Sequence, residues 1–252
     1  MGIKNRQMNR LFITTLSIIC LSFILVPISY LILSVDLGTL LDTLKDGELW
    51  SAMKISLIGA SFASLTGLVM GMPLGFIIAR KQFWGKSLLE SITFLPIVIP
   101  HVAVGIMLLC LFSRIGIPIL DTIYGIILAM LFVSISYVIS SCAMGFSSVD
   151  PELEWTARTL GAGPHHIFFR ITLPLVLPYI GRGFILSFAR SLSEVGAILI
   201  IAYYPKSIPI LIYERFENFG LNAALPATVF FILLSLFVFI LMLLIRRRRG
   251  VF

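Results

Sequence analysis

The amino-acid sequence predicts an all-α integral membrane protein with six transmembrane helices. Of its 252 residues, 59% are hydrophobic and only 12% are charged, and the mean hydropathy is +1.05. A soluble domain of this size cannot hide so large an apolar fraction. The apolar runs are also long and continuous, whereas a membrane β-barrel shows alternating segments of about ten residues. Helices are therefore expected, because they satisfy every backbone hydrogen bond within their own segment.

Six apolar runs are long enough to cross a bilayer, which requires about 20 residues. They are residues 11–35, 51–79, 88–112, 123–142, 175–202 and 224–245. The first run is too long for a secretory signal and lacks a small-residue cleavage site, so it predicts an uncleaved anchor. The chain is thus expected to consist of an N-terminal anchor helix with an external loop (1–49), one membrane core (50–245) and a basic cytoplasmic tail (246–252).

The distribution of basic residues predicts the orientation in the membrane. Of the 19 Lys and Arg residues, twelve lie on the side that carries both predicted termini, five lie on the other side and two fall within the fifth run. Cytoplasmic loops carry the excess of Lys and Arg. The pattern predicts a multi-pass protein of the cell (cytoplasmic) membrane with both termini in the cytoplasm. The net charge of +7 therefore reflects topology and contact with membrane lipid, and no nucleic-acid partner is expected.

A polar segment at residues 150–174 interrupts the apolar sequence. Asp150 and Pro151 form a helix-start signal, because proline is favoured at the first helical position. Gly161, Gly163 and Pro164 end this helix after about three turns, and a second helix is expected to begin near Ile167. A short capped helix at about 150–164 predicts a contact for another protein. The alternative is an interfacial helix resting on lipid headgroups.

The second and third spans contain residues that shape helices. Gly67, Gly71 and Gly75 recur every fourth residue on the second span, which predicts close helix packing. In the third span, Pro96 and Pro100 each remove a backbone donor and are expected to kink the helix. Broken helices at membrane depth tend to line cavities or gates. His101 lies beside this break, either as a packing residue or as a contact for a transported ligand. Gly105 is expected to loosen the helix.

The fifth span carries polar residues on one helical stripe about 100° wide. They are Gly183, Ser187, Arg190, Ser191 and Glu194. Arg and Glu are costly inside a membrane and should face protein or water. The stripe predicts a polar wall of a translocation path, or an Arg190–Glu194 pair that neutralises itself and ties helices together. The candidate path or gate residues are Pro96, Pro100, His101, Ser187, Arg190, Ser191 and Glu194.

The sequence predicts no catalytic residue and no metal site. Its nearest phosphate-loop candidate, Gly85-Lys86-Ser87, lacks the required glycine five positions before Gly85, where Arg80 stands. The three cysteines lie in apolar runs without a partner at metal-ligand spacing. The chain is therefore not expected to be an enzyme itself, and energy for transport would come from a partner.

The 150–174 segment resembles a loop of ABC importer permeases with the pattern E-A-A, three residues, Gly, nine residues, I-x-L-P. Trp155, Thr156 and Ala157 stand at the E-A-A positions, with an acid one place earlier at Glu154. Gly161 follows after three residues, and I-T-L-P begins after nine more. In that family this helix docks in a cleft of the ATP-hydrolysing subunit. The resemblance implies that the ATPase-coupling residues are Glu152, Glu154, Thr156, Ala157, Arg158 and Gly161.

Other stretches resemble permeases for molybdate and tungstate. These are LPIVIPHVAVG, ARSLSEVGAILIIAYYP and IYERFENFGLNAALP, so the resemblance covers about residues 50–245. It implies the ABC importer type I permease fold and a complex of two copies of this chain, two ABC ATPase subunits and an extracytoplasmic oxyanion-binding protein. ATP and Mg would be held by the ATPase, and this chain would bind no cofactor. A sulfate or thiosulfate permease is one alternative, and an ion-coupled secondary carrier is another from a different class.

Overall fold

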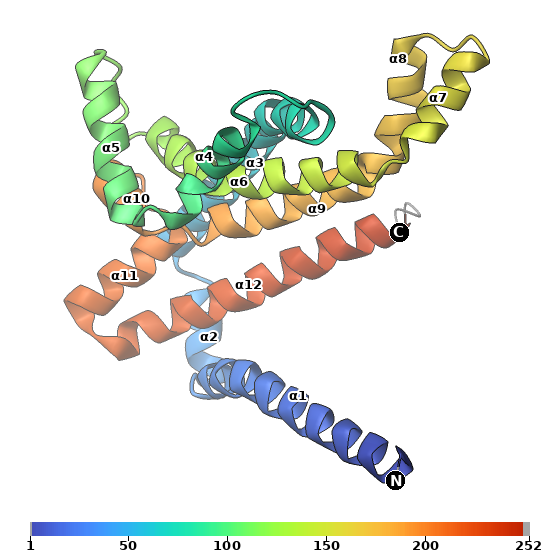
Figure 1. Cartoon of the computed structure of the whole chain (residues 1–252). Helices are drawn as coiled ribbons and strands as arrows, with labels where there is room; N and C mark the ends of the chain where they lie inside the picture. Colours follow the sequence, from blue (N-terminus) through green and yellow to red (C-terminus); the bar gives the residue numbers. More distant parts are fainter. Residues whose placement is uncertain (1, 249–252) are drawn as a thin grey trace.

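The computed structural model describes residues 2–248 and contains only helices in that range (Figure 1). The helices are α1 (Gly2–Leu33), α2 (Leu37–Thr43), α3 (Gly47–Arg80), α4 (Lys86–Val98), α5 (His101–Arg114), α6 (Ile123–Ser148), α7 (Pro151–Thr159), α8 (Pro164–Ile167), α9 (Leu173–Leu192), α10 (Gly196–Ile201), α11 (Ile208–Phe219) and α12 (Leu221–Arg248), with a π-helical turn at Phe168–Thr172 before α9. The predicted all-α class is confirmed.

Five of the predicted spans correspond to helices that are long and apolar enough to cross a membrane. They are Phe12–Leu33, Gly47–Arg80, Ile123–Ser148, Pro164–Leu192 and Leu221–Met242. The sixth corresponds to the pair α4 and α5, which meet at a bend of 107°. The structure thus has six candidate spans when this bent pair is taken as one.

The break between α4 and α5 lies at the second of the two prolines. Ile99 is extended (φ −67°, ψ 130°), as a residue before proline prefers, and Pro100 is the N-cap of α5. Pro96 lies inside α4 without ending it. The prediction that Gly105 loosens the helix is wrong, because α5 continues through this residue from His101 to Arg114. A Cβ there would lie 2.8 Å from the Ala197 carbonyl oxygen, so this glycine lets α10 approach α5 closely.

The fifth span is shorter than predicted. α9 ends at Leu192, and α10 begins at Gly196 after a break in the chain. The continuous helix expected over 175–202 is therefore wrong. The carboxylate of Glu194 lies in this break and accepts a hydrogen bond from the backbone N–H of Ala197 at 2.8 Å. This contact occupies a donor at the start of α10 that the preceding chain does not satisfy.

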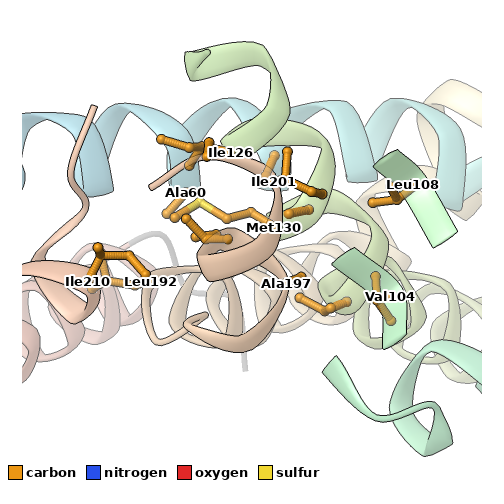
Figure 2. Close-up of a cluster of buried hydrophobic side chains, with 14 of the residues drawn as sticks. Ala60, Val104, Leu108, Ile126, Met130, Leu192, Ala197, Ile201 and Ile210 are labelled. Atoms are coloured by element: carbon orange, nitrogen blue, oxygen red, sulfur yellow. The ribbon is translucent and has the colours of Figure 1, made fainter. Parts of the chain in front are cut away.

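Helices α3, α6 and α9 form the centre of the bundle, with small residues at their contacts. A Cβ on Gly75 of α3 would lie 2.8 Å from the Cβ of Cys142 and 3.0 Å from the Ile139 carbonyl oxygen. The predicted packing role of these glycines is confirmed. Figure 2 shows the main apolar cluster, in which Met130 of α6 and Ala197 of α10 lie among side chains from α3, α5 and α9. The two broken segments are thereby packed into the core.

The ends of the bundle differ in character. Helices α7 and α8 project from one end, and α12 ends on the same side of the view (Figure 1). Helices α5, α10 and α11 lie toward the other end. Helix α1 extends away from the bundle, and none of its apolar span is buried within the chain.

Candidate functional site

Helix α7 forms where the sequence predicts it. The Asp150 carboxylate caps it by accepting a hydrogen bond from the backbone N–H of Glu152 at 2.9 Å, and Pro151 takes the first helical position. After its last turn the chain reverses at Gly161, whose φ is +87°. The second helix begins at Pro164 and not near Ile167, because proline is well suited to the first turn of α8 as well.

Helix α7 exposes large apolar side chains among its polar ones. None of its residues is buried. Leu153, Trp155 and the adjoining Leu160 are 49%, 65% and 83% exposed, and the Arg158 guanidinium lies 5.6 Å from the centre of the Trp155 ring. These four residues are hereafter called the α7 surface. Sequence reasoning missed its apolar part, although a leucine or tryptophan on a short polar helix is a usable signal.

Most of the predicted coupling residues lie on the outside of this loop. Glu152, Thr156, Arg158 and Gly161 are exposed and Ala157 is half-buried. Glu154 differs, because its side chain faces the rest of the chain. Its Oε1 accepts hydrogen bonds from Arg80 Nη2 at 2.9 Å and from Thr172 Oγ1 at 2.8 Å. Sequence reasoning had no means to find these two partners.

A second cluster joins the two broken spans. Glu194 is fully buried, and its Oε2 lies 2.9 Å from Arg190 Nη2 and 2.8 Å from His101 Nδ1. Arg190 Nη2 also lies 2.7 Å from His101 Nε2. Arg190 Nη2 lies equally close to His101 Nδ1, at 2.7 Å. With the proton on Nδ1, His101 donates to Glu194 and its Nε2 accepts from Arg190. These three residues are hereafter called the Glu194 cluster.

The Glu194 cluster places the predicted ion pair at the break in the fifth span. A buried carboxylate needs a cation and further hydrogen bonds, and Glu194 has Arg190, His101 and the Ala197 N–H. The side chains of Arg190 and His101 are 19% and 36% exposed, so the cluster reaches the surface of the chain on one side. It can therefore hold the two breaks together and present polar groups beside them.

The remaining residues of the predicted stripe face elsewhere. Ser187 Oγ donates to Ser134 Oγ at 3.0 Å, and Ser191 Oγ donates to the Met130 carbonyl oxygen at 3.3 Å. Both serines are fully buried against α6. A Cβ on Gly183 would also meet α6, at 3.0 Å from Ser141 Cβ. The predicted stripe does not continue to Glu194, because α9 ends at Leu192. Gly183, Ser187 and Ser191 do share one face, which packs on α6, as expected of residues that face protein and not lipid. The two prolines of the predicted gate also differ, since Pro96 is buried and Pro100 is exposed.

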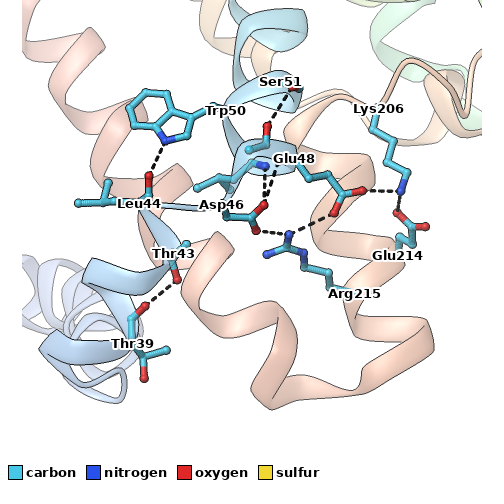
Figure 3. Close-up of polar contacts among 12 residues, drawn as sticks. Thr39, Thr43, Leu44, Asp46, Glu48, Trp50, Ser51, Lys206, Glu214 and Arg215 are labelled. Carbon is cyan, nitrogen blue, oxygen red and sulfur yellow. Dashed lines mark hydrogen bonds and ion pairs between the residues drawn. The ribbon is translucent and has the colours of Figure 1, made fainter.

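A third polar cluster, which sequence reasoning missed, lies at the start of α3 (Figure 3). Lys206 Nζ lies 2.7 Å from Glu48 Oε1 and 2.6 Å from Glu214 Oε2. Arg215 Nη2 is bonded to Asp46 and lies 3.3 Å from Glu48 Oε2. We call these five residues the α3–α11 network. It ties the N-terminus of α3 to α11 and to the loop before it.

The directions in which the pKa values of Asp46 and Lys206 are shifted show that this network favours charged side chains. Burial alone would raise the pKa of Asp46, but the hydrogen bonds from Arg215 and from the backbone N–H groups of Leu49 and Glu48 hold it below its ordinary value of 3.8. Hydrogen bonds to Glu214 and then to Glu48 raise the pKa of Lys206 above 10.5. The network therefore favours the charged forms of Asp46 and Lys206.

A protein-family model and several proteins of known name match most of this chain. The family described as "Binding-protein-dependent transport system inner membrane component" matches residues 71–251. A "Molybdate/tungstate transport system permease protein" of Pyrococcus abyssi is 48% identical over 209 residues, covering 83% of each chain. The protein of that name from Methanocaldococcus jannaschii is 44% identical over 235 residues, covering 90% of this chain and 93% of the relative. A "Molybdenum transport system permease protein" of Escherichia coli is 38% identical over 192 residues, covering 70% and 83%.

Solved structures share the arrangement of helices. A chain of a bacterial alginate ABC transporter superposes with a TM-score of 0.74 at 20% identity, covering 98% of this chain and 96% of that chain. A chain of a methionine ABC transporter superposes with a TM-score of 0.61 at 17% identity, covering 81% and 94%. Given the family match, the close relatives and this shared fold, the chain belongs to the family of binding-protein-dependent transport system inner membrane components and has the fold of an ABC importer permease.

Proposed function

We propose that this chain is the membrane permease subunit of an ATP-driven importer for a tetrahedral oxyanion, molybdate or tungstate. The observation that carries the proposal is the 44–48% identity to permeases named for those two ions, over more than four fifths of each chain. The chain would bind no cofactor, and ATP and Mg would be held by a partner ATPase.

The proposed complex contains two copies of the chain, two ABC ATPase subunits and an external oxyanion-binding protein. The α7 surface supports the ATPase contact, because an exposed helix with Leu153, Trp155 and Leu160 fits an apolar cleft. Glu152, Thr156 and the other exposed coupling residues would form the polar rim.

The proposed gate lies where the two broken spans meet. His101 comes from the start of α5, Arg190 from the last turn of α9 and Glu194 from the break after α9, and the three side chains are in contact. Because Glu194 already neutralises Arg190, the gate would attract an anion only weakly, as passage requires. Ser187 and Ser191 would support the gate through α6, since both bond to that helix.

The test is uptake into proteoliposomes that contain the chain, its ATPase and the binding protein. We expect uptake of labelled molybdate or tungstate that requires ATP and continues when ionophores dissipate ion gradients. Uptake driven by a proton or sodium gradient without ATP would contradict the proposal, and uptake of sulfate alone would contradict the substrate. As a control, Leu160→Glu should abolish ATPase binding, because it places a charge in an apolar contact.

A further inference from the structure

Glu154 bonds to two different membrane helices at once. Its Oε1 accepts from Arg80, in the last turn of α3, and from Thr172, the residue immediately before α9. These partners are 74 and 18 residues away in the sequence. One carboxylate oxygen on α7 is therefore shared by α3 and by the N-cap residue of α9.

Few other contacts hold α7 to the bundle. In the part of the chain that the structure describes, the two bonds of Glu154 are the only side-chain hydrogen bonds from α7 to another helix or turn. No α7 residue is buried. Glu154 therefore supplies the side-chain hydrogen bonds that join α7 to the membrane helices in the described part of the chain.

The Arg80–Glu154 ion pair lies in surroundings that strengthen it. Its side chains are only 16% and 18% exposed, so water screens the pair less than it screens a surface ion pair. Arg80 lies at the C-terminus of α3 and Glu154 in the first turn of α7. Each charge therefore also offsets the dipole of its own helix.

We propose that Glu154 is a positioning residue that clamps the coupling helix α7 to α3 and α9. This rests on the proposed function, in which an ATPase docks on the α7 surface. When the ATPase displaces α7, the shared oxygen moves with it, and both Arg80 and Thr172 follow. The clamp delivers the movement to two spans together, and α9 carries it toward the Glu194 cluster at its far end.

The experiment measures oxyanion uptake and ATP hydrolysis in proteoliposomes that contain the full complex. Glu154→Gln should keep the ATPase subunits bound but lower the uptake per ATP hydrolysed by about tenfold, within the usual range of coupling between sites. Thr172→Val keeps the side-chain shape and removes one donor, so a smaller loss is expected. Glu90→Gln is the matched control. It removes a carboxylate whose Lys86 partner lies 4.0 Å away on the same helix, and uptake per ATP should not change.

A double-mutant cycle tests whether Arg80 and Glu154 act through each other. If they do, Arg80→Gln combined with Glu154→Gln should lower uptake per ATP no further than Glu154→Gln alone. Additive losses would overturn the clamp. If Glu154→Gln prevents assembly, Thr172→Val decides the test.

A simple structural brace predicts a different result. If Glu154 only braces the structure, Glu154→Gln would lower the amount of assembled complex and its melting temperature. The complexes that form would keep the uptake per ATP of the unaltered chain. That result would also overturn the clamp and leave the proposed function standing. If the ATPase subunits do not bind the unaltered chain, the proposed function itself fails.

Discussion

At the scale of single residues, Gly161 determines the turn between α7 and α8. Its φ is +87°, and a Cβ there would meet no atom within 4 Å. A side chain would therefore cost backbone strain alone, about 1–2 kcal/mol. Gly161→Val should distort the turn, displace α8 from α7 and strongly reduce ATP-dependent uptake.

Gly85 offers a matched control for this substitution. It has φ +92° and equally open surroundings, but it lies between α3 and α4. Gly85→Val should lower the melting temperature by a similar amount and leave uptake per complex unchanged. If both variants lose uptake equally, general strain and not the coupling turn is responsible.

Loss of the Glu194 side chain should destabilise the chain strongly. Glu194→Ala removes the carboxylate that partners Arg190, His101 and the Ala197 N–H. Removing one partner of a buried ion pair typically costs about 3–5 kcal/mol. We expect a large drop in the melting temperature of the purified protein, measured by thermal unfolding in detergent.

Exchanging the two charges distinguishes a simple pair from the three-partner cluster. An arginine at position 194 cannot accept the Ala197 N–H and would lie beside His101. The double variant Arg190→Glu/Glu194→Arg should therefore remain destabilised. If it unfolds at the same temperature as the unaltered protein, an Arg–Glu pair alone suffices.

At the scale of elements, the N-terminus of α3 depends on Asp46 in two ways. Asp46 caps the helix and binds Arg215. Asp46→Asn should keep the cap and lose the ion pair, whereas Asp46→Ala should lose both and cost about 1 kcal/mol more. Thermal unfolding of the two variants at neutral pH measures the difference.

The lowered pKa of Asp46 also predicts a pH dependence. A carboxyl group with a folded pKa below its ordinary value stabilises the fold fully above that ordinary value, 3.8. The contribution is lost as the pH falls through the lower folded pKa. The unaltered protein should therefore lose stability more steeply below about pH 4 than Asp46→Asn does. If the melting temperatures of the two proteins fall equally as the pH is lowered below about 4, the prediction is contradicted.

Element boundaries show how far the sequence could predict the structure. The cap at Asp150, the stop at Gly161 and the break at Pro100 follow from local chemistry, and all three were predicted. The end of α9 could not be predicted, because no proline or glycine marks Leu192. The chain after it is instead held by the hydrogen bond from the Ala197 N–H to Glu194 and by packing of α10 on α5. Likewise, Glu154 could not be assigned its partners, because Arg80 and Thr172 meet it only in the folded chain.

At the scale of the whole molecule, the predicted orientation can be tested by labelling. Asp42 and Trp84 lie beyond opposite ends of the α3 span, and their side chains are 75% and 100% exposed. The excess of Lys and Arg predicts that Trp84 lies inside the cell. In a background without Cys20 and Cys110, Asp42→Cys should react with an impermeant thiol reagent in intact cells, and Trp84→Cys should react only after lysis. The reverse pattern would place α7 outside and exclude an ATPase there.

The Arg190–Glu194 pair also bears on how the chain enters the membrane during synthesis. A lone charge at the centre of an inserting helix costs about 2.5–3.5 kcal/mol. Arg190 and Glu194 are four residues apart. A helix that continued through residue 194 during insertion would bring the two side chains together, so that each neutralises the other before α9 meets its neighbours. His101 precedes α9 in the chain, so it is already synthesised when the pair forms and can join it later. We therefore expect the pair that lies at the break in the folded protein also to lower the cost of moving this span from the insertion machinery into lipid.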